Sequence, residues 1–144
     1  MLFRSTIAPE VLTEAAHATY GLAFAVQLVG YYLWRCSYGR DEITMEDVTE
    51  AARLSRRELV SSILEPTLSE LSTREQQYLE AMAQDDGPSA TSDVARRMGL
   101  SMSNASNVRH RLIVYGVIAD RRMGVVDFEL PLMREYLRGE LTAR

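Results

Sequence analysis

The side chains in this sequence that are best suited to chemistry lie between residues 101 and 122. The segment from Ser103 to Tyr115 contains no aspartate or glutamate, and two adjacent arginines follow it at positions 121 and 122. Serine and asparagine are short hydrogen-bonding side chains that can reach base edges, and arginine pairs well with phosphate oxygens. The residues that we expect to contact double-stranded DNA are Ser103, Asn104, Ser106, Asn107, His110, Arg111, Arg121 and Arg122.

A helical period divides the segment 103–115 into two faces. At about 100° per residue, one sector of roughly 80° collects apolar side chains, which we expect to pack inward. These side chains are Ala105, Val108, Leu112 and Tyr115. The DNA-binding candidates on the helix point broadly outward. Arg109 falls near the edge of the apolar face. The pattern fits a DNA contact by Arg109 and an ion pair, for example with Asp93, equally well.

Several of these polar residues also have a purely structural interpretation. Arg96 and Arg97 end the preceding predicted helix, where positive charge favours the helix dipole. Asn104 lies close to the start of its helix and is suited to capping. A single exposed histidine such as His110 is more commonly a surface residue than a ligand.

The elements around this segment follow a recognisable order. Ser72 or Thr73 caps a helix over 72–84, and Thr91 or Ser92 caps a short helix that Gly99 ends. Ser101 or Ser103 then caps the helix 103–115. Strands at 117–119 and 125–130 flank a turn at 120–124, and Pro131 begins a last helix. Helix, short helix, tight turn, helix and two-stranded ribbon is the order of a winged helix-turn-helix domain, which we assign to residues 72–144.

Residues 1–71 indicate a separate subdomain made only of helices. The pattern predicts helices over 9–18 and 22–38, the second apolar on almost all sides and therefore central and buried. A third helix begins at Thr44, with Asp47 completing a capping box, and Pro66 kinks or restarts it. The expected fold class is thus mainly α with a small β-wing.

Charge is distributed unevenly along the chain. The net charge of the 144 residues is −4, and all 16 basic residues are arginine. Residues 1–71 carry 6 arginines and 10 acids, whereas residues 72–144 carry 10 of each. Within 89–124, 6 arginines face only Asp93 and Asp120, a local charge of +4. Local positive charge of this kind attracts a polyanion even when the whole molecule is acidic.

The sequence offers little for catalysis or cofactor binding. His17 and His110 are far apart, Cys36 is the only cysteine, and no zinc-binding cluster or nucleophile motif is visible. We therefore expect no enzyme activity, metal or cofactor in this chain. Its start lacks a signal peptide, and its most apolar run is too short for a membrane span, which favours a cytoplasmic location without membrane contact.

Four stretches in this order resemble a known family. They are YGLAFAVQLVGYYLW with Gln27, Gly30 and Trp34, then ITMEDVTEA, LSTREQQYLEAMAQ and VRHRLIVYGVI. Together they are similar to the carboxyl-terminal lid and winged helix of bacterial AAA+ ATP-binding proteins, whose layout is like that of origin-recognition initiators. The resemblance implies that residues 1–71 are lid-like and that an ATPase core in the same protein is a partner.

This chain departs from the family in two respects. It contains no lysine, so it has no G-x-x-x-x-G-K-[ST] phosphate-binding loop, and we expect it to be part of a longer protein or a shortened gene product. Relatives commonly carry Gly-Tyr-Pro before the lid helix, whereas Gly21-Leu22-Ala23 stands here. The missing proline argues against a direct adenine contact by this lid.

Two alternatives remain compatible with the sequence. The chain could act as a stand-alone winged-helix transcriptional regulator that dimerises through its amino-terminal helices. Alternatively, its winged helix docks onto protein and binds no DNA. Uncovered apolar helices in residues 1–71 would also favour a homodimer.

Overall fold

The computed structural model describes residues 5–141, and the chain divides into two compact units, Met1–Ile63 and Leu64–Arg144. The division precedes the boundary at residue 71 that the sequence suggested. Residues just before 71 belong to the second unit, where the Gln76 side-chain amide donates hydrogen bonds to the carbonyls of Leu68 and Leu71 at 2.8 and 3.1 Å.

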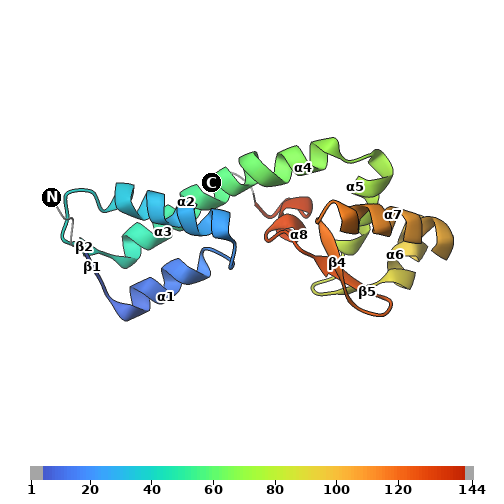
Figure 1. The fold of residues 1–144 in the computed structure, drawn as a ribbon, viewed down its shortest axis with the longest axis horizontal. Coiled ribbons are helices and arrows are strands. Elements are labelled where there is room, and N and C mark those ends of the chain that lie inside the picture. Colours follow the sequence, from blue (N-terminus) through green and yellow to red (C-terminus); the bar gives the residue numbers. More distant parts are fainter. Residues whose placement is uncertain (1–4, 142–144) are drawn as a thin grey trace. The chain divides into compact units, whose positions relative to one another are not determined.

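The first unit contains three helices and a pair of very short strands (Figure 1). In chain order these are β1 (Thr6–Ile7), α1 (Pro9–His17), α2 (Ala23–Cys36), β2 (Glu42–Ile43) and α3 (Met45–Leu59). The two strands pair in parallel, which the sequence did not predict. The core lies where the helices meet and consists of Val11, Ala15, Val29 and Val48.

Helix α3 begins with the predicted capping box. The Thr44 hydroxyl accepts a hydrogen bond from the Asp47 N–H at 3.3 Å, and the Asp47 carboxylate accepts one from the Thr44 N–H at 2.9 Å. Arg40 also pairs with Asp47, which is buried. These contacts lower the pKa of Asp47 although its burial opposes ionisation. The box satisfies backbone groups that the first turn of a helix leaves unpaired.

The prediction that the second helix, apolar on almost all sides, is central and buried is wrong. Only Ala25 and Val29 of α2 are buried, whereas Phe24, Tyr31 and Trp34 are exposed. A helix can bury only the faces that other elements cover, and in this unit α3 is the main neighbour of α2. Helix α2 therefore has more apolar side chains than its own unit buries.

The chain passes from one unit to the other through an irregular helical segment. A π-helical turn, η1 (Val60–Leu64), follows α3 and is followed by α4 (Glu65–Glu70). Pro66 lies in the first turn of α4, a position where its missing N–H costs no helical hydrogen bond. The restart that Pro66 predicted is thus present.

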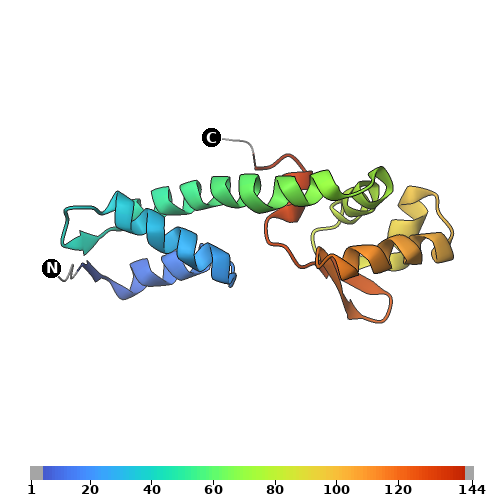
Figure 2. The ribbon, with the colours of Figure 1, turned by 45° about the horizontal axis from the view of Figure 1, so that its top comes forward.

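The second unit combines helices with a small antiparallel sheet (Figures 1 and 2). After α4 its elements are α5 (Thr73–Met82), β3 (Ser89–Ala90), α6 (Thr91–Met98), α7 (Met102–Val114), β4 (Ile118–Arg122), β5 (Val125–Phe128) and α8 (Met133–Leu137). The strand order is β3-β5-β4. A mainly helical fold with a small sheet was predicted, but β3 was not.

The helix ends of this unit were predicted in part. Ser72 caps α5 in a capping box with Glu75, and Gly99 ends α6 in the left-handed region with φ 65°. Ala90, rather than Thr91 or Ser92, precedes α6, because the Thr91 N–H donates to the Gly124 carbonyl at 2.9 Å. The last helix begins at Met133 rather than at Pro131.

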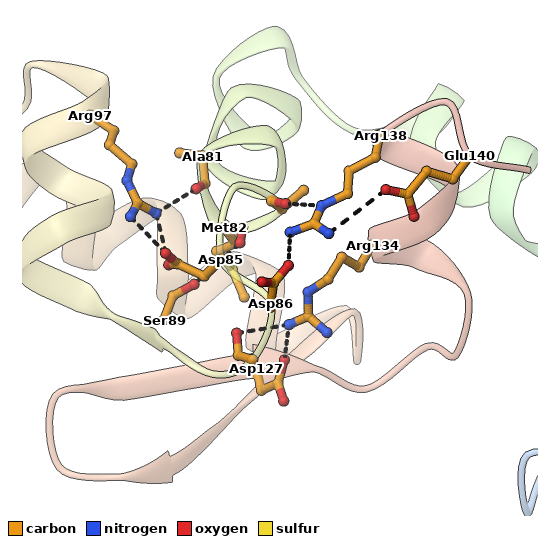
Figure 3. A network of polar contacts seen from close by, with 12 residues as sticks. Ala81, Met82, Asp85, Asp86, Ser89, Arg97, Asp127, Arg134, Arg138 and Glu140 are labelled. Carbon is orange, nitrogen blue, oxygen red and sulfur yellow. Dashed lines mark hydrogen bonds and ion pairs between the residues drawn. The ribbon is translucent and has the colours of Figure 1, made fainter.

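Ion pairs hold the loop after α5 to the rest of the second unit (Figure 3). The two terminal nitrogens of the Arg97 guanidinium, Nη1 and Nη2, donate to the Asp85 carboxylate at 2.8 and 2.7 Å. Arg134 pairs with Asp127 of β5 at 2.7 Å and donates to the carbonyl of Gly87 in this loop at 2.9 Å. Arg138 pairs with Asp86 at 2.9 Å. None of the helices between residues 5 and 141 has both the length and the hydropathy that crossing a bilayer requires.

Candidate functional site

Helix α7 is held so that its polar face points to solvent. Ser101 caps it, since the Ser101 hydroxyl accepts a hydrogen bond from the Asn104 N–H at 3.2 Å. Ala105, Val108 and Leu112 are buried, and α7 packs against α5, α6 and β4. The eight residues predicted to contact DNA are all exposed: Ser103, Asn104, Ser106, Asn107, His110, Arg111, Arg121 and Arg122.

One residue of the predicted apolar face does not pack inward. Tyr115 is 62% exposed, because α7 ends at Val114 and Tyr115 is the residue that follows its last turn. Gly116 then turns the chain toward β4 with φ 74°. The helical period therefore predicts the orientation of residues 105–112 but not that of residue 115.

An open depression lies on the outer side of α7. It is lined by Ser106, Asn107, Arg109, His110, Arg111, Ile113 and Asp120. Four of the eight predicted residues thus gather at one surface. The side chains of Ser103 and Asn104 lie toward the start of the same helix, and Arg121 and Arg122 lie on β4.

Arg111 already has an acidic partner within the chain. Its Nε lies 3.3 Å from a carboxylate oxygen of Glu75, whose other oxygen accepts the Ser72 N–H of the α5 capping box at 2.8 Å. Glu75 is only 5% exposed, so its charge faces the protein rather than solvent. A phosphate that binds Arg111 must compete with this carboxylate.

Arg109 forms the ion pair that its position suggested, but with a different partner. Its guanidinium lies 3.4 Å from Asp120 on β4, whereas Asp93 pairs with Arg96 at 3.0 Å. Asp93 and Arg96 are three residues apart on one helix and are therefore neighbours on its surface. The Arg109 pair connects α7 to the sheet.

The two arginines predicted at the tip of the wing lie in a strand instead. Strand β4 continues to Arg122, so the turn consists of Met123 and Gly124 rather than residues 120–124. Arg121 pairs with Glu129 at 2.8 Å and donates to the Phe128 carbonyl at 3.1 Å. Arg122 is exposed, and among residues 5–141 no ion pair involves it.

The positive charge counted over residues 89–124 is largely compensated in the folded chain. Arg97, Arg111 and Arg121 pair with Asp85, Glu75 and Glu129, all of which lie outside that window. The Arg97 pair is close enough to lower the pKa of Asp85 to about 2. Helix α7 itself contributes no acid to its outer face, but Asp120 of β4 lines the depression there, and the surface is only weakly positive.

A second, smaller cavity of about 60 Å³ lies beneath α7. Its lining consists of Tyr78, Thr91, Met102, Ala105, Ser106 and Arg109. The sequence suggested no functional role for Tyr78 or Thr91, because Tyr78 belongs to the apolar stripe of its helix and Thr91 stood only as a possible cap. No pattern along the chain indicates that these two side chains meet Arg109.

Among residues 5–141, no group of three or more His, Cys, Asp or Glu side chains could hold a metal ion. The thiol of Cys36 is half-buried, and burial raises its pKa.

The second unit is thus a set of helices with a three-stranded antiparallel sheet and an exposed polar helix. A family model described as a domain of unknown function, DUF8462, matches residues 61–137, and the chain belongs to this family. The match includes all of α7 and the β4–β5 hairpin. No curated protein and no solved structure matches the chain.

Proposed function

We propose that residues 64–144 are a winged helix-turn-helix module that binds double-stranded DNA. Helix α7 enters the major groove, and the β4–β5 hairpin is the wing beside it. The observation that supports this function best is the exposed, acid-free outer face of α7, formed by serine, asparagine, histidine and arginine side chains. An acid on this face would repel phosphate, and a large apolar side chain would prevent close approach.

The side chains of this face suit readout of bases. Asn107 and His110 lie in the open depression, and an asparagine amide can form two hydrogen bonds with an adenine edge. Ser103 and Ser106 are small, so the helix can approach the groove floor. Arg122 is placed on the hairpin for a phosphate contact that orients the module without reading sequence.

The ion pairs predict how strongly this module depends on salt. Arg122 has no acidic partner among residues 5–141, and Arg111 can exchange Glu75 for phosphate. Each phosphate contact contributes about −0.9 to the slope of log K against log salt concentration. Arg122 and Arg111 together therefore contribute about −2 to the slope, which is a small contribution for a DNA-binding protein.

The test adds one negative charge to the outer face of α7. We expect Asn107→Asp to weaken binding of a fluorescent DNA duplex by about five- to thirtyfold, since one carboxylate beside phosphates costs about 1–2 kcal/mol. Fluorescence anisotropy at several salt concentrations measures both affinity and slope. The matched control is Gln84→Glu, which adds the same charge at an exposed position after α5.

Two results would contradict DNA binding. One is a wild-type chain that shows no salt-dependent binding to any duplex, including a random-sequence pool. The other is equal affinity for Asn107→Asp and Gln84→Glu, since the effect would then depend on net charge rather than on α7.

Docking onto an acidic or polar protein surface is a second candidate function. It is favoured by the pairing of Arg97, Arg111 and Arg121 with carboxylates, which leaves little positive charge for a polyanion. This function predicts no binding of the wild-type chain to duplex DNA at low salt, where phosphate contacts are strongest.

We also propose that the module belongs to an AAA+ type ATPase, as its lid-like and winged-helix order resembles that class. In such a protein the nucleotide-binding core is supplied in cis and the first unit is the lid. An in-frame phosphate-binding loop encoded upstream of Met1 would support this context, and an unrelated upstream frame would favour a stand-alone regulator.

A further inference from the structure

The small cavity beneath α7 is lined by the apolar side chains of Met102 and Ala105 and by four polar side chains that can donate hydrogen bonds. Tyr78 comes from α5, Thr91 from the start of α6, and Ser106 and Arg109 from α7. Its volume of about 60 Å³ is close to that of two water molecules in the liquid, at about 30 Å³ each. No carboxylate is part of the lining. Ser106 and Arg109 also line the open depression on the outer face, so both hollows adjoin the same two side chains.

The side chain of Tyr78 lines the cavity. Tyr78 as a whole is 1% exposed, and its hydroxyl is not among the fully buried polar atoms that lack a hydrogen-bond partner in residues 5–141. Burial raises the pKa of Tyr78 to about 12, so the phenol stays protonated and can donate at neutral pH. A phenylalanine would fill nearly the same space without burying a polar group, so the hydroxyl contributes little to packing.

Arg109 supplies a second donor to the same cavity. Its Nε is buried and has no hydrogen-bond partner among the described residues. Another nitrogen of the guanidinium, Nη1, donates to Asp120 at the long distance of 3.4 Å. Asp120 therefore holds the Arg109 guanidinium through Nη1, whereas the Nε–H makes no hydrogen bond within the described residues.

We propose that this cavity receives an anionic oxygen of a phosphodiester, with Arg109 and Tyr78 as the donors that bind it. The inference rests on the proposed function, because the phosphodiester belongs to DNA lying against α7. A cationic donor, a neutral phenol and two hydroxyls around one small space favour an acceptor with negative charge, and hydrogen bonds to charged groups are the stronger ones. The same chemistry would accept free phosphate.

The first arm of the test measures DNA binding by variants of the cavity. We expect Tyr78→Phe to bind a duplex roughly tenfold more weakly, the loss typical of one hydrogen bond to a charged group, without a change in salt slope. Arg109→Gln also removes a positive charge and should make the slope less steep by about 1. Asp120→Asn removes a competing carboxylate and should strengthen binding.

Tyr115→Phe is the matched control, because it removes the same hydroxyl from an exposed tyrosine at the end of α7 that does not line the cavity. Ser106→Ala provides a second cavity variant if Tyr78→Phe does not fold, as judged by circular dichroism. Tyr78→Phe or Ser106→Ala that folds and binds DNA like Tyr115→Phe would overturn the inference. The cavity would then hold water only, while the proposed function would stand.

The second arm uses inorganic phosphate and is independent of DNA. The NMR signal of the Arg109 Nε–H should shift with millimolar phosphate in the wild-type chain and much less in Tyr78→Phe. If the wild-type chain fails to bind DNA, the proposed function fails and this arm decides the anion site. If the Arg109 signal shifts, the cavity binds free phosphate. If the signal does not shift, the inference of an anion site is overturned as well.

Discussion

Asp85 and Arg97 form a bidentate ion pair in the second unit. Two hydrogen bonds of 2.7 and 2.8 Å join them, and Arg97 donates a third to the Ala81 carbonyl at 2.9 Å. Both side chains are less than one third exposed, at 27% for Asp85 and 22% for Arg97. The contacts connect the end of α5 to the end of α6, the helix that precedes α7.

We expect Asp85→Asn to destabilise the second unit by about 2 kcal/mol at pH 7. The folded-state pKa of Asp85 is lowered from 3.8 to about 2, so the ionised carboxylate stabilises the fold above pH 4. This contribution is lost as the pH falls from about 4 to about 2. The difference in unfolding free energy between wild type and Asp85→Asn should therefore shrink over that range in urea titrations.

Asp86→Asn is the control for this prediction. Its side chain is 95% exposed, and although it pairs with Arg138, an ion pair in water contributes about 0–1 kcal/mol. A loss from Asp86→Asn as large as that from Asp85→Asn would show that general charge, not the Arg97 contact, stabilises this loop.

At the level of residues, the sequence predicted which side chains are exposed better than it predicted which side chains form ion pairs. The helical period predicted that Ser106, Asn107 and His110 face solvent. It could not predict that Glu75 approaches Arg111 or that Glu129 approaches Arg121, because those partners come from other elements. The cavity around Tyr78 was missed for the same reason, since its side chains come from three helices.

Helix α3 illustrates how well the start of an element can be predicted. Thr44 and Asp47 form both hydrogen bonds of a capping box, as their spacing indicated. Helix ends depend on contacts within a few residues, so the sequence contains most of the information. Burial of α2, the extent of β4 and the existence of β3 depend on distant partners and were predicted wrongly or not at all.

Replacing the cap should weaken the first unit measurably. We expect Thr44→Ala to lower its unfolding free energy by about 1 kcal/mol, the usual cost of losing an N-cap hydroxyl. Trp34 is the only tryptophan and lies in the first unit, so its fluorescence in a urea titration reports this transition.

Thr49→Ala makes the same substitution inside the same helix. Thr49 is exposed and its hydroxyl donates to the Met45 carbonyl within α3, so the change should stay within about 0.5 kcal/mol. If Thr49→Ala costs as much as Thr44→Ala, threonine loss in general, rather than loss of the cap, would explain the effect.

At the scale of the whole molecule, the chain consists of two units with separate buried residues. The first unit has its core around Val29 and Val48, and the second buries Tyr78, Met82 and Leu112. The sequence indicated two parts from their different composition and rhythm, with a boundary at residue 71. The shift to Ile63 arises because α4 contributes its Leu68 carbonyl to Gln76 of α5, a contact that composition does not reveal.

Because the two units have separate cores, we expect a substitution in one unit to change the stability of that unit and not of the other. Thr44→Ala should increase amide hydrogen exchange in peptides from residues 5–59 and leave peptides from 73–137 unchanged, whereas Asp85→Asn should do the reverse. Exchange measured by mass spectrometry reports each region through its own opening free energy. If either variant accelerates exchange equally in both regions, the chain unfolds as one cooperative body, and the losses predicted for Asp85→Asn and Thr44→Ala would then apply to the whole molecule.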